Sequence, residues 1–77
     1  MSVMPLKYVR FADDSFMVFS SSIAHQCACE RITVKPKSAG FLMFDEFELF
    51  AYGDSTTLEI KSDPTDTDFF KGVFANE

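Results

Sequence analysis

This chain has few of the residues that mark several large classes of protein. Its 77 residues include only two cysteines, Cys27 and Cys29. Two thiols at this spacing form at best a strained disulfide and no disulfide framework, so we expect both to be reduced, as in the cytosol. Lys and Arg number seven against twelve Asp and Glu, which gives a net charge of −5. Binding to nucleic-acid phosphates requires clustered cations, and these are scattered, so the charge argues against a nucleic-acid partner.

Long apolar runs are also missing, and the first residues do not have the pattern expected of a secretory leader. No apolar stretch approaches the roughly 18–20 residues that a membrane span requires. The segment 1–5 has no basic region, and Pro5 interrupts its apolar residues, so it does not resemble a signal peptide. These observations predict a cytoplasmic protein with no membrane partner.

Apolar residues, by contrast, are abundant. They make up 47% of the chain and include ten Phe, while charged residues make up 25%. This composition excludes a disordered chain and predicts one globular domain over residues 1–77. A domain of this size buries only about 60% of the surface of its unfolded chain, so we expect a small margin of stability.

The N-terminal part predicts a hairpin followed by a short helix. Residues 6–12 alternate as a strand does, residues 16–19 are apolar, and the polar residues 13–15 between them are typical of a turn. Small and apolar residues then recur at helical spacing over 23–32, after three serines that can cap a helix. Pro36 prevents this helix from continuing.

The C-terminal part predicts three strands and a second helix. The strands are expected at 40–44, 47–52 and 55–61, and the last two are joined by a hairpin loop at Gly53. Asp63 is expected to cap a C-terminal helix, since proline follows it at the first helical position. Together the elements predict an α+β fold of order ββαβββα, with one five-stranded antiparallel sheet and two short helices.

The strands predicted at 16–19, 40–44 and 47–52 are apolar on both faces. Two short helices can cover one face of a five-stranded sheet but hardly both, and antiparallel sheets usually keep one face polar. We therefore predict that part of the second face is a protein interface, most simply between two copies of the chain. The candidate interface residues are Met43, Phe44, Phe50 and Tyr52. The alternative is that loops and the N-terminal hairpin fold over this face.

A pattern of separate segments points to a known kind of protein. It consists of His25, Lys35-Pro36-Lys37-Ser38-Ala39-Gly40-Phe41 and Tyr52-Gly53-Asp54-Ser55. The pattern resembles that of small phage-borne and prophage-borne proteins, and the resemblance covers roughly the C-terminal two-thirds of the chain. It implies an origin in a mobile element. Because such proteins have no established activity, it implies no catalytic, cofactor-binding or metal-binding residue.

The segment Tyr8-Val9-Arg10-Phe11-Ala12-Asp13-Asp14 resembles the catalytic segment of reverse transcriptases, particularly those of group II introns. That resemblance implies Asp13 and Asp14 as ligands of Mg²⁺, because paired carboxylates are what two-metal phosphoryl transfer needs. However, 77 residues are too few for the remainder of a polymerase. We therefore interpret the pair as an acidic hairpin turn.

The sole histidine lies close to both cysteines. On the predicted helix, His25 and Cys29 share a face and Cys27 points away. Two convergent ligands fall short of the four that structural zinc requires. We interpret the cysteines as small buried apolar residues and His25 as a cap or a locally hydrogen-bonded group. No nucleophile–base pair is recognisable either, so we expect no enzyme, no cofactor and no metal.

The sequence therefore favours a small non-enzymatic accessory protein that acts through protein–protein contact, with a second copy or with a host protein. The alternative is an acidic inhibitor that mimics nucleic acid and binds a host nucleic-acid enzyme by charge. Binding by charge weakens steeply with salt, whereas an apolar interface does not.

Overall fold

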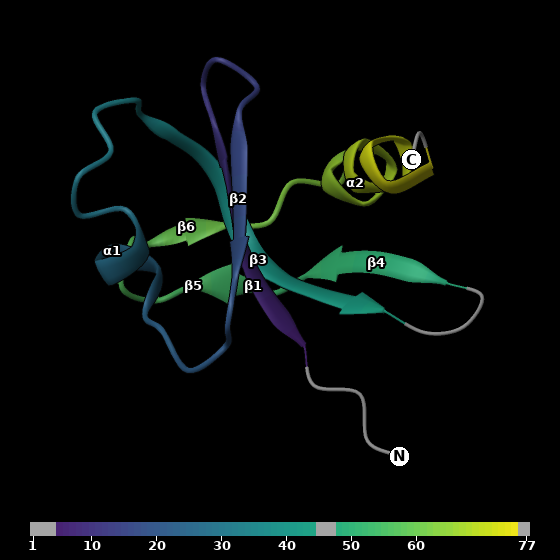
Figure 1. The fold of residues 1–77 in the computed structure, drawn as a ribbon, viewed down its shortest axis with the longest axis horizontal. Helices are drawn as coiled ribbons and strands as arrows, with labels where there is room; N and C mark the ends of the chain where they lie inside the picture. Colours follow the sequence, from purple (N-terminus) through teal and green to yellow (C-terminus); the bar gives the residue numbers. More distant parts are fainter. Residues whose placement is uncertain (1–4, 45–47, 76–77) are drawn as a thin grey trace.

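The computed structural model describes residues 5–44 and 48–75, and it confirms an α+β fold (Figure 1). The elements in chain order are β1 (Leu6–Phe11), β2 (Phe16–Phe19), α1 (His25–Ala28), β3 (Pro36–Phe44), β4 (Leu49–Tyr52), β5 (Asp54–Ser55), β6 (Ile60–Lys61) and α2 (Asp66–Ala75). Within the described residues, neither helix has the length and the hydropathy that a membrane span requires.

Four strands form one antiparallel sheet in the order β2-β1-β3-β4, so β2 and β4 are its edges. The five-stranded sheet expected from the sequence is wrong, because β5 and β6 form a separate two-stranded sheet. Gly53 explains the difference. Its φ of 79° is the positive value expected of a turn glycine, but the turn leads the chain out of the larger sheet. Residue 47, where the strand before Gly53 was expected to begin, lies outside the described residues.

The strand expected at 55–61 is instead a tight hairpin. Residues 56–59 form its turn, and Glu59 has a φ of 56°. Leu58 and Ile60 are nevertheless half-buried while Glu59 is exposed, so burial alternates along this segment although its backbone is not one strand. The Ser62 N–H donates to the Gly53 carbonyl oxygen at 3.0 Å and closes the base of the hairpin.

The first helix is shorter than the sequence predicts, with four residues in place of the segment 23–32. The serines expected to cap it bond to each other: the Oγ atoms of Ser20 and Ser22 are 2.8 Å apart. The N-cap residue of α1 is Ala24, whose methyl side chain cannot accept a hydrogen bond. Instead the Gln26 N–H donates to Thr57 Oγ1 of the β5–β6 turn at 3.1 Å. Tertiary contacts rather than local propensity hold this single turn.

The third strand begins at Pro36, earlier than the expected start at residue 40. Proline is tolerated as the first residue of a strand because its missing N–H is not needed there. Ser38 and Ala39 continue the strand as small buried residues opposite Arg10 and Val9 of β1. The residues just before the expected strand are therefore part of a central strand.

The two faces of the sheet have separate hydrophobic cores. The helix face, covered by α2, has a core of Tyr8, Leu42 and Phe70. The opposite face has a core of Val9, Phe11 and Ala39, against which Cys29, Val34, Leu58 and Ile60 pack. Figure 1 shows α1 and the β5–β6 hairpin together at one end of the molecule and α2 at the other.

Candidate protein-contact surface and buried polar cluster

The opposite face has an open end, formed by β3 and β4. Successive residues of a strand point to different faces, and Leu42 belongs to the helix face, so Phe41 and Met43 point to the opposite one. The register pairs Phe41 with Tyr52 and Met43 with Phe50, and cross-strand partners share a face. We call these four residues the aromatic surface.

The rings of the aromatic surface touch one another and remain partly exposed. Phe41 and Tyr52 are stacked with ring centroids 5.7 Å apart, and the centroids of Phe50 and Tyr52 are 5.8 Å apart. Phe50 is 40% exposed and Tyr52 is 37% exposed. Two large apolar side chains on an edge strand therefore face solvent side by side.

The structure brings together three of the four candidate interface residues, Met43, Phe50 and Tyr52. The side chain of Phe44 lies outside the described part of the structure. Phe41 was not among the candidates, although its position in the same strand as Met43, two residues away, was a signal for it. The expectation that loops cover this face applies at its other end, where Val34 and Cys29 pack over the core. The N-terminal hairpin does not fold over the face, because its strands are part of the sheet.

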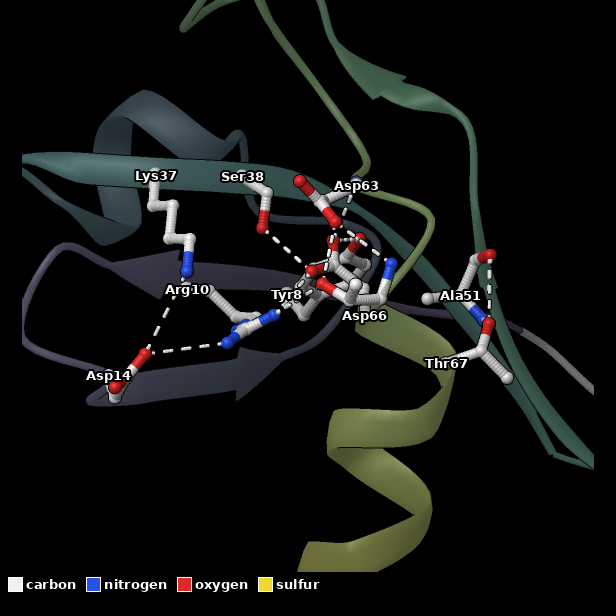
Figure 2. Close-up of polar contacts among 10 residues, drawn as sticks. Tyr8, Arg10, Asp14, Lys37, Ser38, Ala51, Asp63, Asp66 and Thr67 are labelled. Carbon is white, nitrogen blue, oxygen red and sulfur yellow. Dashed lines mark hydrogen bonds and ion pairs between the residues drawn. The ribbon is translucent and has the colours of Figure 1, made fainter.

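The Asp66 carboxylate is the centre of a buried polar cluster on the helix face (Figure 2). It accepts hydrogen bonds from the Tyr8 hydroxyl, from Arg10 Nη1 at 2.8 Å, from Ser38 Oγ at 2.9 Å and from the Asp63 backbone N–H at 2.9 Å. Tyr8, Arg10 and Ser38 come from the two central strands, and Asp66 comes from the first turn of α2. The cluster therefore fixes the start of α2 on the sheet.

Arg10 neutralises this carboxylate from a buried position, with 5% of the residue exposed. Its Cζ lies 3.9 Å from the centroid of the Phe69 ring, which covers one side of the guanidinium. Its Nη2 lies 3.4 Å from Oδ1 of the exposed Asp14. Its Nε is buried and has no hydrogen-bond partner among the described residues. The ion pair with Asp66 is therefore the main compensation for burying this charge.

The cluster combines a local motif that the sequence predicts with tertiary partners that it does not. The Thr65 N–H donates to Asp63 Oδ1 at 2.8 Å, and the Asp63 N–H donates to Asp66, which together make the expected capping box. The hydrogen bonds from Thr65 lower the pKa of Asp63. Tyr8 and Arg10 occupy what the alternation of residues 6–12 indicates to be the polar face of a strand. Nothing in the local sequence shows that a helix cap would cover that face.

The bonding of the cluster indicates a structural role. An ionised carboxylate has about four lone-pair positions, and protein donors already fill them at Asp66. Burial, and then the hydrogen bond to Asp66, raises the pKa of the Tyr8 phenol, which keeps Tyr8 a protonated donor. We therefore do not place the functional site of the protein in this cluster.

Asp13 and Asp14 form the β1–β2 turn that their residue types predict. Asp13 Oδ1 accepts hydrogen bonds from the Ser15 hydroxyl and from the Ser15 N–H at 3.0 Å, and these bonds lower the pKa of Asp13. Asp14 has a φ of 68°, a value that Asp tolerates. Its Oδ1 faces Arg10 and, at 3.9 Å, Lys37. The two carboxylates thus have different partners, and nowhere in residues 5–44 and 48–75 do three metal-ligating side chains gather.

His25 is a buried tertiary contact and not the local group expected from the sequence. Its Nε2 donates to the Gly40 carbonyl oxygen of β3 at 2.9 Å. The rings of Phe19 and Phe41 pack against it with centroid distances of 5.5 and 6.0 Å. Burial lowers the pKa of His25, and the nearby Lys7 charge acts in the same direction. The neutral imidazole therefore joins α1 to the sheet.

The two cysteines lie in different environments. Cys29 is half-buried in the core of the opposite face, and burial raises the pKa of its thiol. Cys27 is exposed. The interpretation of both residues as buried apolar side chains is therefore wrong for Cys27.

Comparison with known proteins adds no relative. The chain matches no protein-family model, and neither a curated protein nor a solved structure matches it. The residues described above are therefore the only basis for assigning a function.

Proposed function

We propose that this protein is a non-enzymatic accessory protein that acts through protein–protein contact, with the aromatic surface as its contact site. The observation that carries the proposal is the adjacent exposure of Phe50 and Tyr52 on one edge strand, at 40% and 37%. Aromatic side chains are enriched at interfaces, because they bury a large area at a low cost in conformational entropy. The resemblance to phage-borne proteins favours the accessory role.

The exposed area indicates what kind of contact this surface can make. An aromatic side chain buries about 150–250 Å² when it is fully covered, so each of the two rings offers roughly 60–100 Å². A stable interface buries about 800 Å² on each partner. The two rings supply only a fraction of that area, so they suit a weak contact in which they anchor the centre of a larger interface. They are too small to hold two copies together by themselves.

The proposal is tested by capture of a partner from an extract of the source cells on the immobilised protein. We expect a discrete protein that is retained in high salt, because the contact is apolar. The double variant Phe50→Ala, Tyr52→Ala should lose it. Ile32→Ala is the matched control, because Ile32 is also 40% exposed but lies outside the aromatic surface. Circular dichroism of each variant checks that the fold is intact.

Two results would contradict the proposal. The first is equal retention of the partner by the wild type and the double variant. The second is a partner that is released by moderate salt from all three proteins, which would favour the alternative of an acidic inhibitor that binds by charge.

A further inference from the structure

The two edges of the four-stranded sheet differ in how they are protected. On β4, the Ala51 N–H donates to Thr67 Oγ1 at 2.9 Å, and the Thr67 hydroxyl donates to the Ala51 carbonyl oxygen at 3.4 Å. A side chain of α2 therefore occupies the backbone groups in the middle of this edge. Covering an edge in this way prevents another strand from pairing with it.

The outer edge of β2 has no such cover. The Phe11 N–H donates to the Ser15 carbonyl oxygen at 2.8 Å, which sets the alternation of the β1–β2 ladder. Hydrogen-bonded and non-hydrogen-bonded residue pairs alternate along an antiparallel ladder. Because Phe11 and Ser15 form a hydrogen-bonded pair, the N–H and C=O groups of Met17 bond to β1. The N–H and C=O groups of Phe16 and Val18 therefore point away from the sheet. Among the residues that the structure describes, none bonds to these outward groups.

The sequence of β2 also lacks the usual protection. Edge strands are commonly blunted by charged side chains, by proline or by a bulge. Residues 16–19 contain neither a charge nor a proline, and their register with β1 is regular. Phe16 is 38% exposed at the start of this strand. Unpaired backbone groups on an uncharged apolar strand are what strand addition requires.

We propose that the outer edge of β2 pairs with the same edge of a second copy, in antiparallel orientation about a two-fold axis at Met17. In this register Phe16 lies opposite Val18 of the second copy, and Val18 lies opposite its Phe16. Each outward N–H then meets an outward carbonyl oxygen, so the edge is self-complementary, as a two-fold interface must be. The two four-stranded sheets become one continuous sheet.

This register also keeps the acidic side chains apart. A chain with a net charge of −5 repels its own copy unless the interface avoids like charges. The β2 residues that pair in this register carry no charge, so no two carboxylates lie opposite each other along the paired strands.

Dimerisation would also strengthen the protein contact proposed above, and this step alone rests on that proposed function. Each copy carries one aromatic surface, so the dimer would present two of them on one particle. A partner with two binding sites could engage both, and the linked second contact would strengthen a binding that each small surface makes only weakly.

The first test uses the unmodified chain. Light scattering over a wide concentration range should show the mass rising from 8.7 kDa towards twice that value. Amide hydrogen exchange over the same range should show the Phe16 and Val18 amides becoming protected as the dimer forms. The Met17 and Phe19 amides, which bond to β1, should be protected at every concentration. A monomer throughout, or fast exchange of Phe16 and Val18 in a dimer, would overturn the proposal.

The second test modifies the edge and leaves its side chains in place. Chemical synthesis with an N-methyl group on Val18 removes an outward donor and adds bulk at the interface, and we expect the dimer to dissociate at least about tenfold more readily. Phe16→Lys replaces this variant if the N-methyl chain does not fold. Phe50→Ala, Tyr52→Ala is the control, and its dimer should be unchanged. If the control loses the dimer and the edge variants keep it, the copies associate through the aromatic surface and the proposed edge is wrong.

Discussion

Replacing Asp66 with Asn tests the structural role of the buried polar cluster. The change removes one charge at nearly constant volume and leaves Arg10 with its contact at 3.4 Å to Asp14, whose side chain is 70% exposed. The new amide group also brings donors into a site where the Tyr8 and Ser38 hydroxyls already donate. The variant thus combines an unpaired buried cation with mismatched hydrogen bonds.

The expected loss is large compared with the whole stability of the domain. Breaking a buried ion pair by removing one partner costs about 3–5 kcal/mol. At about 0.05–0.15 kcal/mol per residue, a chain of this length has roughly 4–12 kcal/mol of unfolding free energy in total. Asp14→Asn is the matched control, because Asp14 contacts the same guanidinium from an exposed position, and its loss should stay below about 1 kcal/mol.

Urea unfolding followed by far-ultraviolet circular dichroism measures both variants, and equal slopes against denaturant would show that the denatured states are comparable. If Asp66→Asn and Asp14→Asn lose the same small amount of unfolding free energy, the buried polar cluster does not stabilise the fold. A double-mutant cycle with Arg10→Met separates the charge pair from its surroundings. Losses that simply add would show that Arg10 and Asp66 are not coupled.

Three further substitutions test contacts elsewhere in the fold. Gly40→Ala should destabilise the protein by about 1–3 kcal/mol, because its new Cβ would collide with the Tyr52 carbonyl oxygen. Gly72→Ala should stabilise α2 by about 0.5–1 kcal/mol, since a Cβ there meets nothing within 4 Å; a loss of stability in urea would show this to be wrong. His25→Gln should reduce the pH dependence of stability. The folded state lowers the pKa of His25 from its usual value of 6.5. The wild type should therefore lose stability as the pH falls from 6.5 through the folded-state pKa. The Gln variant should not show this loss, because Gln does not titrate. Unfolding free energies of both proteins, measured above and below this pH range, check the prediction. An equal pH dependence of stability in the wild type and the variant would count against it.

Features whose cause lies within a few residues could be predicted from the sequence. The β1–β2 turn follows from Asp13 and its hydrogen bonds to Ser15. The start of α2 follows from Asp63 and Asp66, which form the capping box. In both cases the side chain that defines the motif bonds to a backbone group at most three residues away. Local chemistry determines such features whatever the rest of the chain does.

Features that depend on tertiary contacts could not be predicted in this way. The alternation over 55–61 is regular, yet Leu58 and Ile60 are directed inward by a hairpin that packs on the core of the opposite face. Alternating burial fits either a single strand or two short ones, so the pattern did not decide between them. The same limit applies to the contact site. The sequence indicates Phe50 and Tyr52 as apolar residues of one strand, but only the position of α1 and the hairpin shows which end of the face stays open.

The tertiary placement of the acidic residues also bears on how the protein binds. Asp66 is buried against Arg10, and Asp14 lies between Arg10 and Lys37. These two of the twelve acidic residues are therefore paired with cations, one of them in the interior. A mimic of nucleic acid needs dense charge that is free to meet a basic partner. Glu48 and Asp54, by contrast, are exposed on either side of β4. Charge at those positions borders the aromatic surface. If this surface is the contact site that we propose, the charge would orient an approaching partner and the rings would determine how long that partner stays bound.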